Sequence, residues 1–513
     1  MKLFKNSLVI GGFTLISRLL GFVREMLMAN VFGSGPMANA FVVAFRFPNL
    51  FRRWFAEGAF NSAFVPLYAG KLEADGQDAA DQFAREALSV LLTSLLILML
   101  VSELAMPWIM RVMAPGFLQE PGLFAKTVLF AQITMPYILF MSLTAMLSGI
   151  LNAHLRFAAA ASAPIILNIV LVSILLSSPA EPAVAALYLS IGVGVSGLLQ
   201  VLVVVLGCRH IGIKLALVRP RLTPGVRRLI TLGVPGAIAA GVVQINLVVG
   251  QVFASFQEGA VAWLYYADRL YQLPLGVVGI AMGVALLPGL SRQVRGGDEK
   301  GAADTLNEAL VLSAALTLPA AIALGVLPVY FIEGVFLHGA FTGQDAMATG
   351  HALMAYAFGL PSFIMIKVFA PGYFAREDTK TPMQFAALSM LVNVSLGAAL
   401  FFSIGFVGLA IATSVAGWVN AMALGIGLWR HGHFVPDRAL ASRLLRLLLA
   451  AVVMGFALMV LAEPLRTALS TMPFYRLLSA VLVAVIGVLV FALAALMTRA
   501  VQLHEIKSLL RRS

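Results

Sequence analysis

Residues 17–61 carry charged side chains inside a stretch whose flanks are as apolar as membrane spans. The basic residues there are Arg18, Arg24, Arg46, Arg52 and Arg53, and the acidic residues are Glu25 and Glu57. A guanidinium at the centre of a spanning helix costs about 2.5–3.5 kcal/mol on insertion scales. These side chains therefore have to face a wet cavity or counter-charges, and such a cluster predicts a functional site.

The balance of charge within the predicted spans is positive. Their basic residues are Arg18, Arg24, Arg46, Arg52, Arg53, Arg269 and Lys367, and their acidic residues are Glu25, Glu57, Glu103 and Asp268. An excess of positive charge in a low-dielectric cavity attracts an anion, and the two parallel N–H donors of arginine suit phosphate. Two alternatives need no ligand: salt bridges that brace the helices, and long side chains that reach the membrane surface.

One helical face between residues 38 and 68 gathers several of these polar side chains. Asn39, Arg46, Asn49, Arg53 and Glu57 fall within about 80° of one another at 100° per residue. Arg53 and Glu57 are spaced to pair across one helical turn. Pro48 is expected to bend the helix, so the choice between Arg52 and Arg53 as the residue that enters the cavity stays open.

The composition predicts an all-α polytopic membrane protein. Of the 513 residues, 61% are hydrophobic and 11% charged, with a mean hydropathy of +0.95, whereas soluble domains are about 25% charged. A spanning helix needs about 20 apolar residues. The sequence holds fourteen such runs: 6–30, 38–68, 86–113, 123–151, 159–178, 183–207, 227–256, 261–291, 304–332, 347–370, 382–403, 406–429, 442–462 and 474–499.

The loop charges predict the orientation. With the N-terminus in the cytoplasm, the inner segments hold 24 Lys and Arg and the outer segments four. The positive-inside rule then puts both termini and the basic linker 209–228 in the cytoplasm, with an uncleaved first span. The net charge of +12 does not indicate nucleic-acid binding, because the basic residues are dispersed over short loops.

An internal repeat relates the second and eighth spans. Aligning Pro66 with Pro288 brings Arg46 near Asp268 and Arg269. The offset of six spans is even, so the repeats are parallel. We therefore expect two six-helix lobes around a central cavity, residues 1–218 and 219–433, and two further transmembrane helices in 434–513.

Three other patterns have less specific interpretations. Gly192 to Gly197 matches a dinucleotide-binding fingerprint, but within an apolar span it predicts close helix packing. The acidic residues Glu73, Asp75, Asp78 and Asp81 predict a solvated cytoplasmic loop. No metal-ligand spacing and no nucleophile–base arrangement occurs in the sequence, so we expect neither a cofactor, a metal nor an enzyme.

Four stretches carry a resemblance to a known family. They are SRLLGFVRE at 17–25, FRFPNLFRRWFAEGAFNSAFVP at 45–66, WLYYADRLYQLPLGVVGIA at 263–281 and KVFAPGYFAREDTKTP at 367–382. Over essentially its whole length the chain resembles the MurJ (MviN) family of lipid II flippases, in the multidrug/oligosaccharidyl-lipid/polysaccharide exporter superfamily. The resemblance implies fourteen spans in two six-helix lobes, with a groove along 442–499 for the polyprenyl tail.

The resemblance also implies the residues of the site. Substrate-binding arginines carry over to Arg18, Arg24, Arg52 and Arg269, and acidic positions to Glu57 and Asp268. We combine these residues with those that the helical pattern places on the charged faces. The candidate substrate-binding residues are then Arg18, Arg24, Arg52, Arg53 and Arg269, and the candidate supporting residues are Glu25, Asn49, Glu57 and Asp268. Two positions depart from the family pattern: many members have Asp where this chain has Asn39, and some have Ser where it has Ala262.

The function implied is the transfer of lipid II from the cytoplasmic to the periplasmic leaflet of the bacterial inner membrane by alternating access. The resemblance implies membrane lipids and the peptidoglycan synthesis machinery as partners, and we expect a monomer. The alternatives are a flippase for another polyprenyl-diphosphate-linked oligosaccharide and a multidrug–cation antiporter, which a positive cavity disfavours. A membrane-embedded polyprenyl-phosphate transferase would require metal-binding carboxylates, and the sequence shows no such motif.

Overall fold

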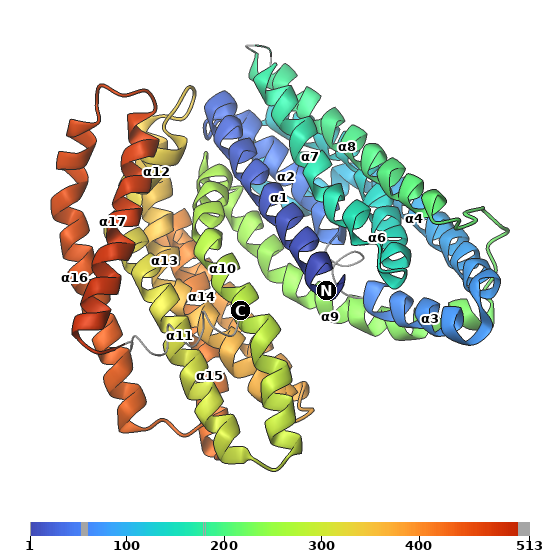
Figure 1. The fold of residues 1–513 in the computed structure, drawn as a ribbon. Coiled ribbons are helices and arrows are strands. Elements are labelled where there is room, and N and C mark those ends of the chain that lie inside the picture. The colour runs from blue at the N-terminus through green and yellow to red at the C-terminus, as the bar shows by residue number, and fades with distance from the viewer. Residues whose placement is uncertain (1, 53–59, 178, 180, 501–513) are drawn as a thin grey trace. The chain divides into compact units, whose positions relative to one another are not determined.

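A computed structural model describes residues 2–52, 60–177, 179 and 181–500, and within them it contains helices and no strands (Figure 1). The first half of the chain forms α1 (Lys2–Phe32), α2 (Pro36–Arg52), α3 (Phe60–Asp75), α4 (Gln77–Met113), the short 3-10 helix η2 (Pro115–Gln119), α5 (Pro121–Thr134), α6 (Tyr137–Ala153), α7 (Phe157–Leu176), α8 (Pro182–His210) and α9 (Pro224–Ala254). The second half forms α10 (Ala260–Arg295), α11 (Glu299–Val326), α12 (Pro328–Phe336), α13 (Gly343–Phe374), α14 (Lys380–Ile404), α15 (Phe406–Arg430), α16 (Arg438–Ala468) and α17 (Tyr475–Met497).

The fourteen predicted spans agree with this helix order. Each predicted range falls on one helix or on two consecutive helices. The range 38–68 covers α2 and α3 with the undescribed residues 53–59 between them, and α5 and α6 join at Pro136 into one apolar segment. Ten segments of the described chain are long and apolar enough to cross a membrane. The prediction of an all-α polytopic membrane protein is therefore confirmed.

The chain divides into two compact units, Met1–Ala262 and Trp263–Ser513. The division falls inside α10 because α9 packs against α3, α4 and η2 of the first unit. The predicted repeat lobes, 1–218 and 219–433, and the additional pair in 434–513 stay a prediction. Each unit is described below by itself.

In the first unit, α7 lies between α1 and α8 and packs against both (Figure 1). Small residues permit the close approaches. A Cβ atom on Gly192 would lie 2.3 Å from Cδ1 of Ile174, and one on Gly197 would lie 2.9 Å from the ring of Tyr137. The dinucleotide-like fingerprint is thus a helix-packing pattern, as the sequence predicted.

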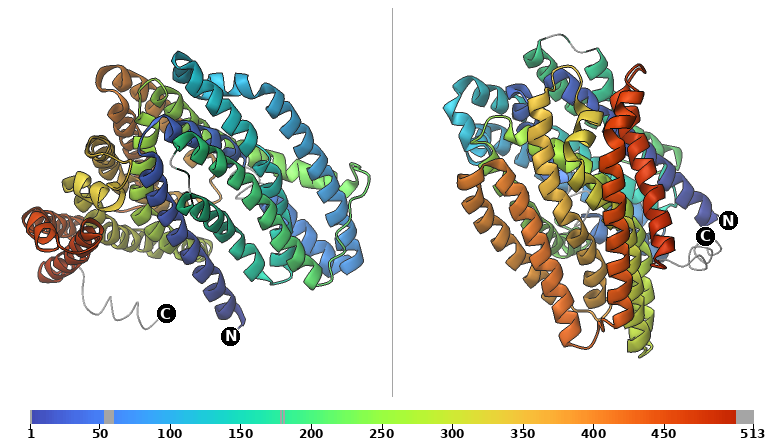
Figure 2. Two further views of the ribbon diagram at one scale, coloured as in Figure 1. Left: turned by 90° about the horizontal axis from the view of Figure 1, so that it is seen from above. Right: turned by 90° about the vertical axis from the view of Figure 1, so that its left-hand side faces the viewer.

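In the second unit, α13 packs against α11 and α15, and the last pair, α16 and α17, lies side by side against α11 and α12 (Figure 2). A polar contact ties this pair to α12. Nη1 of Arg466 lies 2.6 Å from Oε2 of Glu333, and the same guanidinium stacks 4.0 Å from the centre of the Tyr330 ring. The pair is therefore fixed to the second unit by charge as well as by apolar packing.

The prediction of a solvated acidic loop is wrong for Asp81. Asp81 lies in the second turn of α4, is 2% exposed and accepts three hydrogen bonds. The donors are Nε2 of Gln77 at 2.7 Å, the backbone N–H of Lys214 at 3.3 Å and the hydroxyl of Tyr68 at 3.5 Å. The carboxylate is tolerated inside because these donors replace water, and it ties the 209–228 linker to α3 and α4.

This polar cluster predicts a loss of stability in acid. Nε2 of His154 lies 3.1 Å from the Tyr68 hydroxyl, and burial lowers the pKa of His154, partly offset by Asp81. Burial also lowers the pKa of His338 and of His433. As the pH falls, these histidines are protonated in the unfolded chain before they are protonated in the folded protein. The free energy of unfolding is therefore unaffected by them above the ordinary histidine pKa of about 6.5, and it decreases as the pH falls from there through the lowered pKa values. We expect a lower melting temperature at about pH 5.5 than at about pH 7.5, and a smaller difference in His154→Gln.

A second stability prediction concerns Gly116 in η2. A Cβ atom there would lie 2.2 Å from the backbone oxygen of Ser255, at the end of α9. Backbone cannot swing aside like a side chain, so Gly116→Ala should cost about 1–3 kcal/mol and lower the melting temperature of the purified protein. The matched control is Gly122→Ala, because a Cβ atom on Gly122 meets nothing within 4 Å. Equal melting temperatures for the two variants would contradict the close contact of η2 with α9.

Candidate functional site

Arg24 is the best-defined arginine of the candidate set. It lies in α1, its side chain is 15% exposed, and Nη1 donates a hydrogen bond of 3.0 Å to Oδ1 of Asn168 on α7. Nη2 forms an ion pair with Oε1 of Glu25, whose side chain is 4% exposed. A half-buried guanidinium that donates to the Asn168 amide and pairs with Glu25 has a defined direction, which a bidentate phosphate contact requires.

Asn168 is a residue that the sequence reasoning missed. Its Nδ2 donates to the backbone oxygen of Ser17 on α1 at 2.9 Å and to that of Pro164 at 3.3 Å. In the sequence it is a single amide inside the apolar run 159–178, and it carries no charge that would mark it. Only the packing of α7 against α1 brings it to Arg24.

The other candidates of the first unit are described to different degrees. Arg18, six residues before Arg24 on α1, is exposed, and Asn49 on α2 is half-buried. Arg52 is the last residue of α2, and its side chain lies outside the described part. Arg53 and Glu57 lie outside the described residues altogether, so their predicted pairing stays a prediction.

Asn39, one of the two departures from the family pattern, is satisfied as an amide. It is 3% exposed, its Oδ1 accepts from the backbone N–H of Ala262 at 2.9 Å, and its Nδ2 donates to the backbone oxygens of Ser34 and Gly35 at 2.8 and 3.0 Å. The amide thus ties the start of α2 to the start of α10 within the first unit. The side chain is neutral, and a charged carboxylate in its place would face the two carbonyl oxygens that Nδ2 now meets.

In the second unit, Asp268 and Arg269 lie in α10 with aromatic neighbours. The guanidinium of Arg269 stacks 4.6 Å from the centre of the Tyr265 ring, and Asp268 accepts a hydrogen bond from Nε2 of Gln272. Tyr266 and Tyr271 are buried core residues. The Tyr265 ring attracts the guanidinium through its quadrupole and so favours this orientation of Arg269. That Arg269 completes one site with Arg24 stays a prediction.

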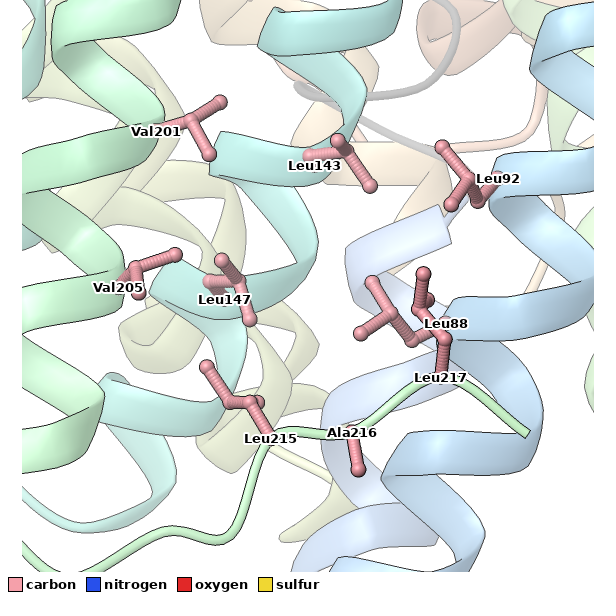
Figure 3. Close-up of a pocket in the computed structure, with 9 residues that line it drawn as sticks. All are labelled: Leu88, Leu92, Leu143, Leu147, Val201, Val205, Leu215, Ala216 and Leu217. Atoms are coloured by element: carbon pink, nitrogen blue, oxygen red, sulfur yellow. The ribbon is translucent and has the colours of Figure 1, made fainter.

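One pocket of the first unit has a different character. It has a volume of about 270 Å³ and lies among α4, α6, α8 and the linker (Figure 3). Its lining is wholly aliphatic: Leu88, Leu92, Leu143, Leu147, Val201, Val205, Leu215, Ala216 and Leu217. With no charged or polar side chain among these residues, it suits hydrocarbon and does not suit a diphosphate. In the described chain, no three His, Cys, Asp or Glu residues gather where they could hold a metal ion.

Comparison with known proteins gives the family. The model of the family "Lipid II flippase MurJ" matches residues 28–480 of this chain. The chain belongs to the MurJ family. A relative from Rhizobium tropici, "Probable lipid II flippase MurJ", is 49% identical over 479 residues, covering 92% of this chain and 90% of that protein. The "Lipid II flippase MurJ" of Burkholderia cenocepacia is 34% identical, covering 89% of each.

Solved structures agree with this membership. "Lipid II flippase MurJ, inward closed conformation" matches with a TM-score of 0.78 at 27% identity, covering 94% of this chain and 98% of that one. An inward-facing multidrug MATE transporter of the MOP superfamily matches with a TM-score of 0.67 over 81% of this chain. Its 14% identity shows a shared fold alone. The MurJ family consists of multi-pass transporters of peptidoglycan synthesis rather than enzymes. The prediction of a membrane transporter is therefore confirmed.

Proposed function

We propose that this protein moves lipid II from the cytoplasmic to the periplasmic leaflet, with the diphosphate held by arginines. The observation that carries the proposal is the fixed guanidinium of Arg24, half-buried in a chain that belongs to the MurJ family. Arg18, Arg52, Arg53 and Arg269 are proposed to share the binding, supported by Glu25, Asn49, Glu57 and Asp268. Several guanidiniums together offer the paired donors that a diphosphate accepts.

The movement is alternating access. Parallel repeats suit a site near the membrane midplane that opens to one side at a time as the lobes rock. The sugar–peptide head group then crosses inside the protein while the arginines offset the charge of the diphosphate. The polyprenyl tail stays in hydrocarbon along α16 and α17, whose outward faces expose large apolar side chains such as Phe456 and Val488. No covalent step is needed, and a monomer is sufficient.

Depletion of the protein from its native cell tests the proposal. Lipid II should accumulate in the cytoplasmic leaflet, where an impermeant reagent added outside does not reach it. Accumulation of another polyprenyl-diphosphate saccharide, with lipid II unaffected, would instead assign the protein to that substrate. Unchanged lipid pools with increased retention of cationic drugs would favour the antiporter.

The orientation gives a separate prediction. The linker 209–228 carries six of the 24 inner basic residues, so we expect it and both termini in the cytoplasm. A single cysteine at Leu215, in a Cys208→Ala background, should stay unlabelled by an impermeant reagent in intact cells and react after permeabilisation. Labelling of Leu215→Cys in intact cells would reverse the predicted orientation.

A further inference from the structure

We propose that Asn168 is a positioning residue for substrate binding: its neutral amide directs the Arg24 guanidinium without placing a further negative charge beside it. The inference deepens the proposed function and rests on Arg24 as a diphosphate ligand. Its starting point is the bond of 3.0 Å from Nη1 of Arg24 to Oδ1 of Asn168, which joins α1 to α7 across 144 residues of sequence.

The hydrogen bonds fix which way the amide points. Nδ2 faces the backbone oxygens of Ser17 and Pro164, at 2.9 and 3.3 Å, and both can only accept. Oδ1 therefore faces Arg24, which can only donate. In a flipped amide, Nδ2 would face the Arg24 donor and Oδ1 would face the two backbone oxygens. The backbone of α1 and α7 therefore determines that Arg24 meets the amide oxygen.

Burial against α1 holds Asn168 in this position. The residue is 6% exposed, and α1 packs closely beside it at Gly21, where a Cβ atom would lie in ordinary van der Waals contact with Nδ2 at 3.6 Å. An amide in such a place keeps one rotamer, and the guanidinium bonded to it loses little further entropy when a ligand arrives. Preorganisation of this kind raises affinity without a new contact to the ligand.

Glu25 and Asn168 have different electrostatic effects on Arg24. Glu25 neutralises part of the positive charge, whereas the amide of Asn168 directs the group and leaves the charge intact. An aspartate at position 168 would form a second ion pair with Arg24 and repel the diphosphate. Asn168→Asp, although nearly isosteric, is therefore expected to weaken binding, and so is Asn168→Ala.

The test measures lipid II affinity of the full-length protein in nanodiscs, together with its abundance in membranes. Asn168→Ala should weaken affinity about tenfold, the equivalent of one charge-assisted hydrogen bond, with abundance near that of the wild type. In an Arg24→Ala background the same substitution should change affinity no further. The matched control is Ser162→Ala, also on α7: its hydroxyl donates to the backbone oxygen of Ala159 in the same helix, and its loss should leave affinity unchanged.

The outcomes separate this inference from the proposed function. Wild-type affinity in Arg24→Ala contradicts the role of Arg24 itself. Two results would contradict the positioning role alone. In the first, Arg24→Ala loses affinity and Asn168→Ala does not. In the second, Asn168→Ala causes the same loss of affinity whether Arg24 is present or replaced. If Asn168→Ala fails to accumulate, Asn168→Leu, which fills the space, replaces it in the cycle. Loss of both variants from the membrane would make Asn168 a brace of α1 on α7 and overturn the inference.

Discussion

Arg24→Ala should abolish lipid II transport while the protein still inserts and accumulates. The substitution removes the two parallel N–H donors proposed to bind the diphosphate. Two charge-assisted hydrogen bonds of about 1.5–3 kcal/mol each correspond to a loss of affinity on the order of 100-fold or more. Arg24→Lys should restore little, because lysine keeps the charge and loses the bidentate geometry. Arg269→Ala should behave in the same way. The measurements are lipid II affinity and membrane abundance.

The ion pair with Glu25 gives a test of the alternative that Arg24 is a structural brace and not a ligand. If Arg24 were a brace, its removal would leave the buried Glu25 carboxylate without this cation, at about 3–5 kcal/mol, and the protein would be lost from the membrane. The double variant Arg24→Ala/Glu25→Ala should then restore abundance, and the survivors should bind lipid II normally. A matched control is Arg111→Ala: this exposed arginine of α4 stacks on Trp108 at 4.4 Å, outside the candidate site, and its loss should spare binding.

A crosslink between the repeats should block transport completely. Ala69 in α3 and Gly289 in α10 lie near the predicted cytoplasmic ends of the second and eighth spans. Alternating access requires those ends to separate and approach in each cycle, so a disulfide between cysteines there should trap one state. Transport should stop on oxidation and return on reduction.

The background for this experiment is simple, because the chain has one cysteine. Cys208 is buried, and Cys208→Ala removes it. Each single-cysteine variant should transport normally under oxidation, which separates trapping from damage. Transport that continues while the crosslink is complete would rule out rocking of the lobes.

Much of the fold could be predicted because the bilayer imposes a strong pattern. Apolar runs of span length had to be helices, and Pro136 and Pro48 lie inside predicted spans, as helix-disturbing residues often do in membranes. The charged residues were visible for the same reason: Arg24 and Glu25 are conspicuous inside an apolar run. The sequence alone therefore pointed to the right fold and family.

Residues whose role depends on long-range packing were not predictable. Asn168 carries no charge and reaches Arg24 only because α7 packs against α1. In the sequence Asp81 belongs to an acidic run that is typical of a solvated loop. In the structure the 209–228 linker packs against α4, the backbone N–H of Lys214 donates to Asp81, and the carboxylate is buried. In both cases the partner lies more than 130 residues away in sequence, at positions 24 and 214, and no local spacing encodes it.

The most direct test of lipid II transport through Arg24 uses the purified protein in proteoliposomes. Lipid II and a second polyprenyl-diphosphate saccharide, each labelled on the head group, would be incorporated together, and an impermeant reagent would report their leaflet over time. We expect the wild type to move lipid II in preference to the second lipid, and Arg24→Ala to move neither. Equal movement of both lipids, or wild-type movement by Arg24→Ala, would contradict this expectation.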